Sequence, residues 1–352
     1  MKDYENPFTL SFGNRPYRYV SRENDKNELA EKLMAKTPVA RCFIISGVRG
    51  SGKTVMLTSL SSMFAKLDDW VVIDLNPDDD MREGLAAKLY SSSSMKHLFL
   101  EKNFGFSFHG FSFSVSGKTP ILHIDDLLDR MLSLIKAKGK KVLVTIDEMT
   151  NTKYLRQFIL SFQMLIRKDY PLFIVGTGLY ENISSIENEG NLTFLLRAPK
   201  IILPPLSLPS IASLYEESLS LNREAAVACA KVTKGYALAF QVLGYLMFEA
   251  HKRAMDDELM SEFDNYMSDF AYAKIWSSLS GVERKIVSAF DDESPIEIGA
   301  LLKKLTMSKE YFSRYRDRLL KKGVLVAPSH GLLSFALPRF KAFIDNALAF
   351  GL

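Results

Sequence analysis

Residues 47–54 read Gly-Val-Arg-Gly-Ser-Gly-Lys-Thr, a segment that matches the pattern G-x-x-x-x-G-K-[ST] in full. An apolar run at 42–46 precedes it, and a helix-compatible segment at 55–67 follows it. Strand, glycine-rich loop and helix in this order form the setting in which the pattern cradles phosphates. The glycines let successive N–H groups point inward, and the helix adds its positive N-terminal end. The segment therefore predicts an α/β core that binds a nucleotide.

Each residue of this loop has an expected role. Lys53 is expected to reach the β- and γ-phosphates of ATP, and the Thr54 hydroxyl to ligate Mg²⁺. The competing interpretation is an ordinary glycine-rich turn, which the flanking strand and helix disfavour. The residues that we expect to contact the nucleotide are Gly47, Val48, Arg49, Gly50, Ser51, Gly52, Lys53, Thr54 and Val55.

Residues 140–148 form a second, largely apolar run that ends in two acids, Asp147 and Glu148. A continuous apolar run is typical of a strand buried on both faces, and ligands bind at the carboxyl ends of such strands in open α/β sheets. We expect Asp147 to hold Mg²⁺, and Glu148 to polarise the attacking water as a general base. The alternative is a solvated turn after a strand.

Further apolar runs at 70–75, 171–178 and 200–203 complete a set of five strands that alternate with helices. This alternation predicts a parallel sheet with right-handed crossovers. In P-loop proteins whose two acids are adjacent, one further strand lies between the strand before the loop and the strand before the acids. We expect the strand at 171–178 to take this place. That order is written 5-1-4-3-2. It would aim Thr177 at the γ-phosphate, whereas a helix cap or turn hydroxyl is the plainer interpretation.

Composition narrows the class of protein. The 352 residues carry a net charge of +4, which permits a nucleic-acid partner without arguing for one. Cys42 and Cys229 form no metal or redox motif, and the histidines show no ligand spacing, so Mg²⁺ is the one metal expected. The polar start and the lack of an apolar stretch near 18 residues predict a cytoplasmic protein without a membrane span.

The last eighty residues predict three helices and a two-stranded wing, which is a winged helix-turn-helix. The helices are expected at 280–290, 295–305 and 308–322, and the strands at 324–326 and 332–337. In such folds the third helix enters the major groove of double-stranded DNA. A solvated helix face, or a wing used for protein contacts, is the alternative. The cations of the third helix are Lys309, Arg314, Arg316, Arg318, Lys321 and Lys322.

Residues 104–116 alternate phenylalanine with serine around His109-Gly110, which predicts a β-hairpin inserted in the core. Packing of its phenylalanines on the core is favoured over an aromatic contact surface for a partner, because an exposed row of phenylalanine invites aggregation.

These residues resemble those of the AAA+ and STAND-type ATPases, in particular ATPases with a C-terminal winged helix and initiators of the origin-recognition type. The segment 19–29 is similar to the entry box of that group, with Ser21 in place of its glycine. The resemblance implies an ATPase core at 1–203, a helical lid at 204–273 and a winged helix at 274–352. It also implies that Arg197 is a finger toward a nucleotide, either of a neighbouring subunit in a homo-oligomer or of the same chain; the alternative is an ordinary surface arginine.

One segment departs from the group. Residues 235–239, Gly-Tyr-Ala-Leu-Ala, align with its second sensor helix, yet they contain neither the arginine of initiators nor the Gly-x-Pro of STAND proteins. Two functions stay open. One is an ATPase whose nucleotide state controls a DNA-binding winged helix. The other is a slowly hydrolysing signalling switch with protein partners.

Overall fold

The computed structural model describes residues 5–11, 17–101, 106–108, 111–113, 123–190 and 192–351. Two compact units make up the chain. The first, here called the sheet unit, comprises Glu23–Ser46 and Lys53–Ile202. The second, the helical unit, comprises Met1–Arg22, Gly47–Gly52 and Leu203–Leu352. The glycine-rich part of the loop thus packs with the helical unit, while Lys53 and Thr54 belong to the sheet unit.

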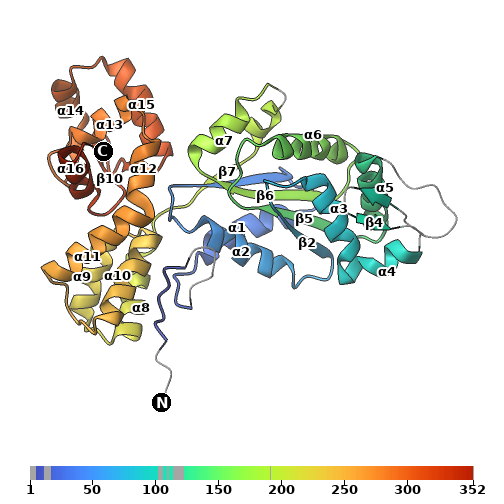
Figure 1. Ribbon diagram of the computed structural model, residues 1–352, viewed down its shortest axis with the longest axis horizontal. Coiled ribbons are helices and arrows are strands. Elements are labelled where there is room, and N and C mark those ends of the chain that lie inside the picture. Colours follow the sequence, from blue (N-terminus) through green and yellow to red (C-terminus); the bar gives the residue numbers. More distant parts are fainter. Residues whose placement is uncertain are drawn as a thin grey trace. The chain divides into compact units, whose positions relative to one another are not determined.

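A parallel sheet with strand order β2-β5-β6-β1-β7 is the centre of the sheet unit (Figure 1). This is the predicted order, because β6 lies between the loop strand β1 and the acid strand β5. Every residue of β1 and of β6 is buried, as the predicted continuous apolar runs require. The strands are β1 Cys42–Ser46, β2 Trp70–Leu75, β5 Lys141–Ile146, β6 Leu172–Gly178 and β7 Lys200–Ile202.

Helices cover both faces of this sheet: α1 and α2 lie on one side, and α3, α5 and α6 on the other (Figure 1). In α6 the buried residues recur at helical spacing, and the Thr152 side chain caps its first turn by accepting from the Leu155 amide. The helices are α1 Glu23–Met34, α2 Lys53–Phe64, α3 Met81–Ser91, α4 Ser93–Glu101, α5 Ile124–Ala137, α6 Lys153–Arg167, α7 Tyr180–Glu187 and the 3₁₀ turn η1 Thr193–Arg197.

The two strands of the inserted hairpin are present. Strand β3, Phe106–Phe108, pairs antiparallel with β4, Phe111–Phe113, so that Phe106 lies opposite Phe113. The turn at 109–110, the remainder of the predicted span 104–116 and the packing of the phenylalanine rings lie outside the described residues.

The helical unit contains the predicted helices after residue 206 and a small antiparallel sheet with strand order β8-β10-β9. Its elements are α8 Leu208–Leu219, α9 Arg223–Thr233, α10 Ala237–Glu249, α11 Asp257–Met267, the π turn η2 Ser268–Tyr272, α12 Ala273–Ser278, α13 Gly281–Ser288, β8 Ile296–Glu297, α14 Ile298–Leu305, α15 Lys309–Lys321, β9 Leu325–Val326, β10 Leu332–Phe335 and α16 Phe340–Ala349.

Three helices and then the strands β9 and β10 follow in the order expected for the C-terminal region. The expectation was wrong at one point, since the predicted second helix begins with strand β8 and becomes helical only at Ile298. Pairing of Ile296 and Glu297 with β10 takes the place of a first helical turn. The domain boundaries at 203 and 273 stay predictions, as does the use of this region as a winged helix.

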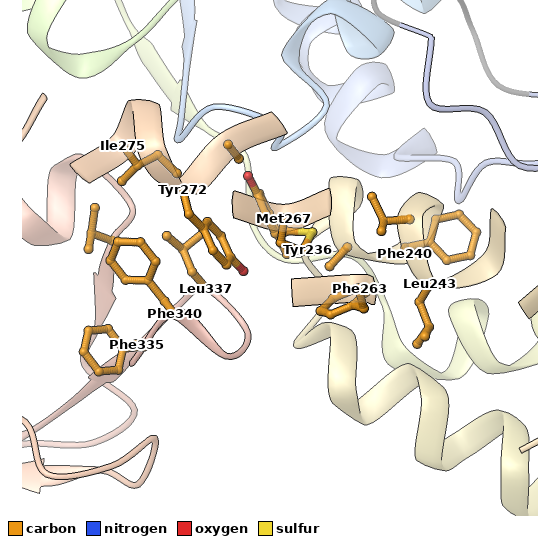
Figure 2. Close-up of a cluster of buried hydrophobic side chains, with 14 of the residues drawn as sticks. Tyr236, Phe240, Leu243, Phe263, Met267, Tyr272, Ile275, Phe335, Leu337 and Phe340 are labelled. Atoms are coloured by element: carbon orange, nitrogen blue, oxygen red, sulfur yellow. The ribbon is translucent and has the colours of Figure 1, made fainter. Parts of the chain in front are cut away.

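One continuous hydrophobic core runs through the helical unit (Figure 2). Phe240 and Phe263 come from the predicted lid, whereas Phe335 and Phe340 come from the C-terminal region, and Tyr272 of the π turn contacts the ring of Phe340 edge-on. The helix α11 continues through this π turn into α12 without a loop. The lid and the C-terminal region therefore share a single core, and packing resists their separation.

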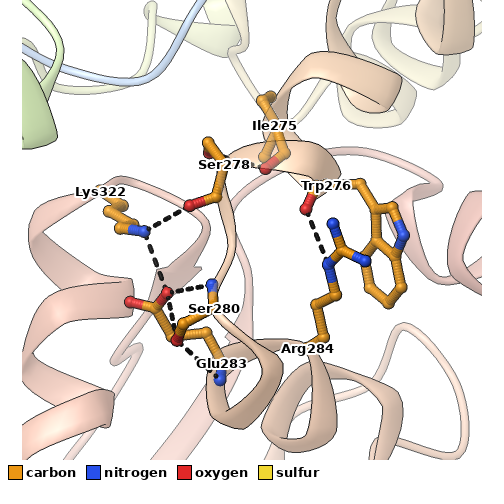
Figure 3. A network of polar contacts seen from close by, with 7 residues as sticks. All are labelled: Ile275, Trp276, Ser278, Ser280, Glu283, Arg284 and Lys322. Carbon is orange, nitrogen blue, oxygen red and sulfur yellow. Dashed lines mark hydrogen bonds and ion pairs between the residues drawn. The ribbon is translucent and has the colours of Figure 1, made fainter.

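A buried ion pair joins α13 to the end of α15 (Figure 3). The Lys322 ammonium lies 3.0 Å from a Glu283 carboxylate oxygen, and the two side chains are 8% and 2% exposed. The same carboxylate accepts from the Ser280 amide in a capping box. Burial raises the pKa of Glu283, but the hydrogen bonds from Ser280 and Lys322 outweigh it, so this pKa lies below its ordinary value. The sequence predicted Lys322 among the cations of the third helix that would face DNA, but its side chain is buried and pairs with Glu283.

Replacing Lys322 with methionine should destabilise the protein by about 3–5 kcal/mol, because it leaves the Glu283 carboxylate buried without its cation. The matched control is Lys304→Met on α14, whose partner Asp291 is exposed; it should cost less than about 1 kcal/mol. Urea unfolding followed by circular dichroism measures both.

The same pair predicts a pH dependence. Because the folded-state pKa of Glu283 is lowered, its stabilisation is present above the ordinary value of 4.5 and is lost as the pH falls below it. The difference between wild type and Lys322→Met should therefore shrink at acid pH; an unchanged difference would contradict the assignment.

Candidate nucleotide site

The glycine-rich loop has the backbone of a phosphate cradle. Gly50 and Gly52 adopt φ values of 76° and 91°, which residues with a β-carbon rarely adopt. The Ser51 amide donates to the Val48 carbonyl at 3.2 Å and closes a tight turn. A β-carbon placed on Gly47 would lie 2.8 Å from the Ser51 hydroxyl oxygen, so a side chain there would require this hydroxyl to move.

Thr54, Asp147 and Thr177 meet at the carboxyl ends of β5 and β6. The Thr54 hydroxyl, in the first turn of α2, donates to one Asp147 carboxylate oxygen at 2.9 Å. The Thr177 hydroxyl donates to the other oxygen and accepts from the Glu148 amide at 3.0 Å. Two segments far from Asp147 in the sequence thus converge on its carboxylate, and the structure brings together Thr54, Asp147 and Thr177 of the side chains that the sequence singled out.

The Glu148 carboxylate is presented to solvent by an unusual backbone. Glu148 has a φ of 52° and an exposed side chain, while Met149 next to it is fully buried. The Met149 amide donates to the Thr177 carbonyl at 2.7 Å, which fixes the chain on both sides of Glu148. A left-handed conformation costs free energy for a residue with a β-carbon. Of the six other described non-glycine residues that adopt it, Ser220, Lys234 and Thr306 are helix C-caps, whereas Glu148 comes just after a buried strand.

The sequence did not reveal that Gly176 lies against Met149, the residue after Glu148. A β-carbon on Gly176 would lie 2.0 Å from the Met149 sulfur, so Gly176 makes room for the side chain that anchors the acid segment. The only sequence signal was a glycine inside a buried strand, which indicates close approach of another group without naming it.

Arg197 is exposed at the end of η1, directly after Leu196, which is 54% exposed. In the described part of the chain, no hydrogen bond connects Arg197 with the Asp147 group. Its role as an arginine finger stays a prediction.

The residues present fit a magnesium-bound nucleoside triphosphate. Mg²⁺ in such sites is commonly held by one or two protein oxygens, with phosphate oxygens and water completing its shell, and the paired oxygens of Thr54 and Asp147 suit this. The Ser51 hydroxyl oxygen is buried in the loop without a hydrogen-bond partner, as expected of a group that awaits an anion. No group of three or more His, Cys, Asp or Glu among the described residues could hold a metal without the nucleotide.

Both cysteines are buried, and burial raises the pKa of Cys42 to about 12 and that of Cys229 to about 11. They remain thiols at neutral pH and are poor nucleophiles. In the part of the chain that the structure describes, no helix has the length and apolar character needed to cross a membrane.

The strand order 5-1-4-3-2, a phosphate loop after β1 and adjacent acids after β5 define the fold class of the AAA+ P-loop ATPases. One solved structure shares this fold along the whole chain. Compared with the ORC2 protein of Aeropyrum pernix, solved as ADPNP and ADP complexes, the chain has a TM-score of 0.54 at 13% identity, covering 100% of this chain and 97% of that one. The resemblance inferred from the sequence is thus confirmed at the level of the fold.

Other comparisons are more distant. Cdc6p of Pyrobaculum aerophilum gives a TM-score of 0.47 at 14% identity over 97% of each chain. The ORC1 protein of Aeropyrum pernix in complex with DNA gives 0.43 at 14% identity, over 95% of this chain and 94% of that one. A domain of unknown function, DUF8462, matches residues 270–344. No curated protein matches the chain.

Replacing the buried Thr177 with valine should destabilise the nucleotide-free protein by about 1–3 kcal/mol, because the Glu148 amide loses its acceptor. Thr177→Ser keeps the hydroxyl and is the control, with a smaller loss from one missing methyl group. Thermal unfolding compares the two, and equal losses would show that the hydroxyl contributes nothing.

Proposed function

We propose that this protein binds ATP with Mg²⁺, hydrolyses it, and uses its nucleotide state to control a C-terminal winged helix that binds double-stranded DNA. The observation that carries the proposal is the hydrogen-bonded group of Thr54, Thr177, the Asp147 carboxylate and the Glu148 amide, in which Thr54 directly follows the glycine-rich loop and Lys53 in the sequence. The shared fold with an ORC2 protein solved with ADPNP and ADP supports it.

In this mechanism the loop amides and the Lys53 ammonium hold the phosphates. Mg²⁺, when bound, neutralises charge on the phosphate oxygens, and Thr54 and Asp147 are the residues placed to hold it. The exposed Glu148 carboxylate orients a water for in-line attack and accepts its proton. An oxygen–phosphorus bond then forms at the γ-phosphorus while the bond to the β-phosphate oxygen breaks, and the products are ADP and phosphate.

Thr177 is the positioning residue of this group. Its hydroxyl donates to the Asp147 carboxylate and accepts from the Glu148 amide. A movement of either acid would therefore shift the Thr177 hydroxyl and, through it, the other acid. This arrangement suits a sensor that reports on the γ-phosphate, and we assign that role to Thr177.

The DNA-binding part of the proposal rests on α15. Phe312 and Leu319 are buried and fix one face of the helix, while Lys309, Arg314 and Arg318 are exposed. Arg318 also lies over the Tyr315 ring, with its guanidinium carbon 5.5 Å from the ring centroid. Such cations contact phosphates or base edges when a recognition helix docks in the major groove. Arg316 is half-buried and is a weaker candidate for this contact.

Glu148→Gln should keep ATP affinity but lower the rate of hydrolysis by about 10²–10⁴-fold, because the amide cannot accept the water's proton. Lys53→Ala should abolish ATP binding. Release of phosphate and titration with a fluorescent ATP analogue measure these effects, with Glu224→Gln, an exposed acid on α9, as the control. Normal hydrolysis by Glu148→Gln would disprove the general-base role.

The same assay tests Arg197 and the homo-oligomer. If Arg197 reaches a neighbour's nucleotide, a mixture of Arg197→Ala and Glu148→Gln chains regains activity, because an intact site then receives an intact arginine. Two inactive variants that stay inactive when mixed would rule out action between subunits.

Arg314→Ala combined with Arg318→Ala should weaken DNA binding by at least about tenfold and lower the slope of log affinity against log salt by about two. The control removes two cations from α9, Arg223→Ala with Lys231→Ala, and should leave both quantities unchanged. Fluorescence anisotropy with a labelled duplex, with and without ATP, is the measurement.

Slow ATP turnover with no DNA affinity in either nucleotide state would instead support the signalling switch. The absence of an arginine from residues 235–239, at the start of α10, is the feature that favours this second candidate.

A further inference from the structure

Three successive carbonyl groups of the glycine-rich loop are held by donors from outside the loop. The Tyr236 hydroxyl donates to the Arg49 carbonyl, and the Leu238 amide donates to the Gly50 carbonyl at 3.0 Å. The Arg22 guanidinium donates to the Ser51 carbonyl at 3.2 Å. All of these residues belong to the helical unit. We call Arg22, Tyr236 and the Leu238 amide the loop clasp.

The clasp sets the direction of the loop's amides. In a trans peptide the C=O of one residue and the N–H of the next point to opposite sides. Holding the carbonyls of Arg49 and Ser51 outward therefore turns the amides of Gly50 and Gly52 to the other side, where a phosphate would lie. The clasp prearranges the cradle without contacting the ligand.

Gly50 shows that the loop is built around this contact. The phosphate pattern accepts any residue at this position, yet the chain has glycine. A β-carbon on Gly50 would lie 2.6 Å from the Tyr236 hydroxyl oxygen and 2.9 Å from the Leu238 β-carbon. The close approach of residues 236–238 is thus a reason for this glycine that the phosphate itself does not supply.

The segment before α10 is shaped to deliver these donors. Gly235 has a φ of 74°, and its carbonyl accepts from the Leu206 amide at 2.7 Å, which fixes the turn. Tyr236 is the N-cap of α10, so the Leu238 amide is one of the first-turn donors that have no partner inside the helix. The Gly50 carbonyl fills that vacancy at the positive end of α10.

Tyr236 also connects the loop with the core of the helical unit. It is 6% exposed, and Figure 2 shows it among the buried side chains, together with Phe240, Met267 and Tyr272. A β-carbon on Gly323, which follows α15, would lie 3.3 Å from the Val48 β-carbon. The loop therefore lies close to the end of α15 as well as to the start of α10.

We propose that the loop clasp positions the phosphate cradle and couples nucleotide binding to the helical unit, in the place of the arginine that residues 235–239 lack. Nucleotide is then sensed through the loop backbone rather than by a cation on the γ-phosphate. This inference rests on the proposed ATP binding. Coupling of this kind is reciprocal: what stabilises the clasped arrangement also strengthens nucleotide binding.

The test is Tyr236→Phe in the full chain, because it removes the donor and keeps the ring in the core. ATP affinity, measured with a fluorescent ATP analogue and Mg²⁺, should fall about tenfold. Tyr215→Phe and Tyr272→Phe are matched controls, since their hydroxyls also donate to buried carbonyls, those of Phe240 and Pro338, away from the loop. Both should keep wild-type affinity even where they lower the unfolding temperature.

A second pair of variants guards against a folding artefact. Gly50→Ala inserts a methyl group into the clasp, whereas Gly139→Ala places one at a similar φ of 68° with no atom within 4 Å. Only the first should weaken ATP binding. Hydrogen exchange gives the coupling directly, since ATP should slow exchange at residues 237–240 in wild type but not in Tyr236→Phe.

The outcomes separate the two proposals. Failure of wild type to bind ATP would overturn both. Wild-type affinity in Tyr236→Phe, or an equal loss in Tyr215→Phe, would overturn the clasp and leave ATP binding intact.

Discussion

The Asp147 carboxylate is the interaction on which the candidate site depends. It accepts from Thr54 and Thr177, and so ties the first turn of α2 to the ends of β5 and β6. Each of these residues is at the end of an element whose position is set by burial, since β5 and β6 are almost wholly buried. The hydrophobic core therefore places the polar group, and the polar group in turn holds Glu148 in a left-handed conformation that a free chain would avoid.

The glycine-rich loop is divided between the two compact units. Gly47–Gly52 pack with the helical unit, and Lys53 begins α2 of the sheet unit. One core joins the lid helices to the C-terminal region, so Gly47–Gly52 belong to the same compact unit as α15.

Much of this was accessible from the sequence because it depends on local patterns. The loop motif, the buried strands and the paired acids are contiguous runs whose periodicity and end residues are diagnostic, and the strand order followed from the adjacency of Asp147 and Glu148. What the sequence could not predict depends on contacts between distant residues. Met149 against Gly176, and Lys322 with Glu283, meet only after folding, and a lysine beside other cations gives no sign that it will be buried. Strand β8 is only two residues long and exists because β10 pairs with it.

Gly50 has a consequence for the ancestry of the chain. Its missing side chain and the Tyr236 ring with its hydroxyl occupy one small volume, although 186 positions of sequence separate them. A mutation at either position alone is penalised by the other, so the two are expected to change together among descendants of the same ancestor. Lineages in which positions 50 and 236 have both changed would be those in which the start of α10 contacts the glycine-rich loop through different side chains.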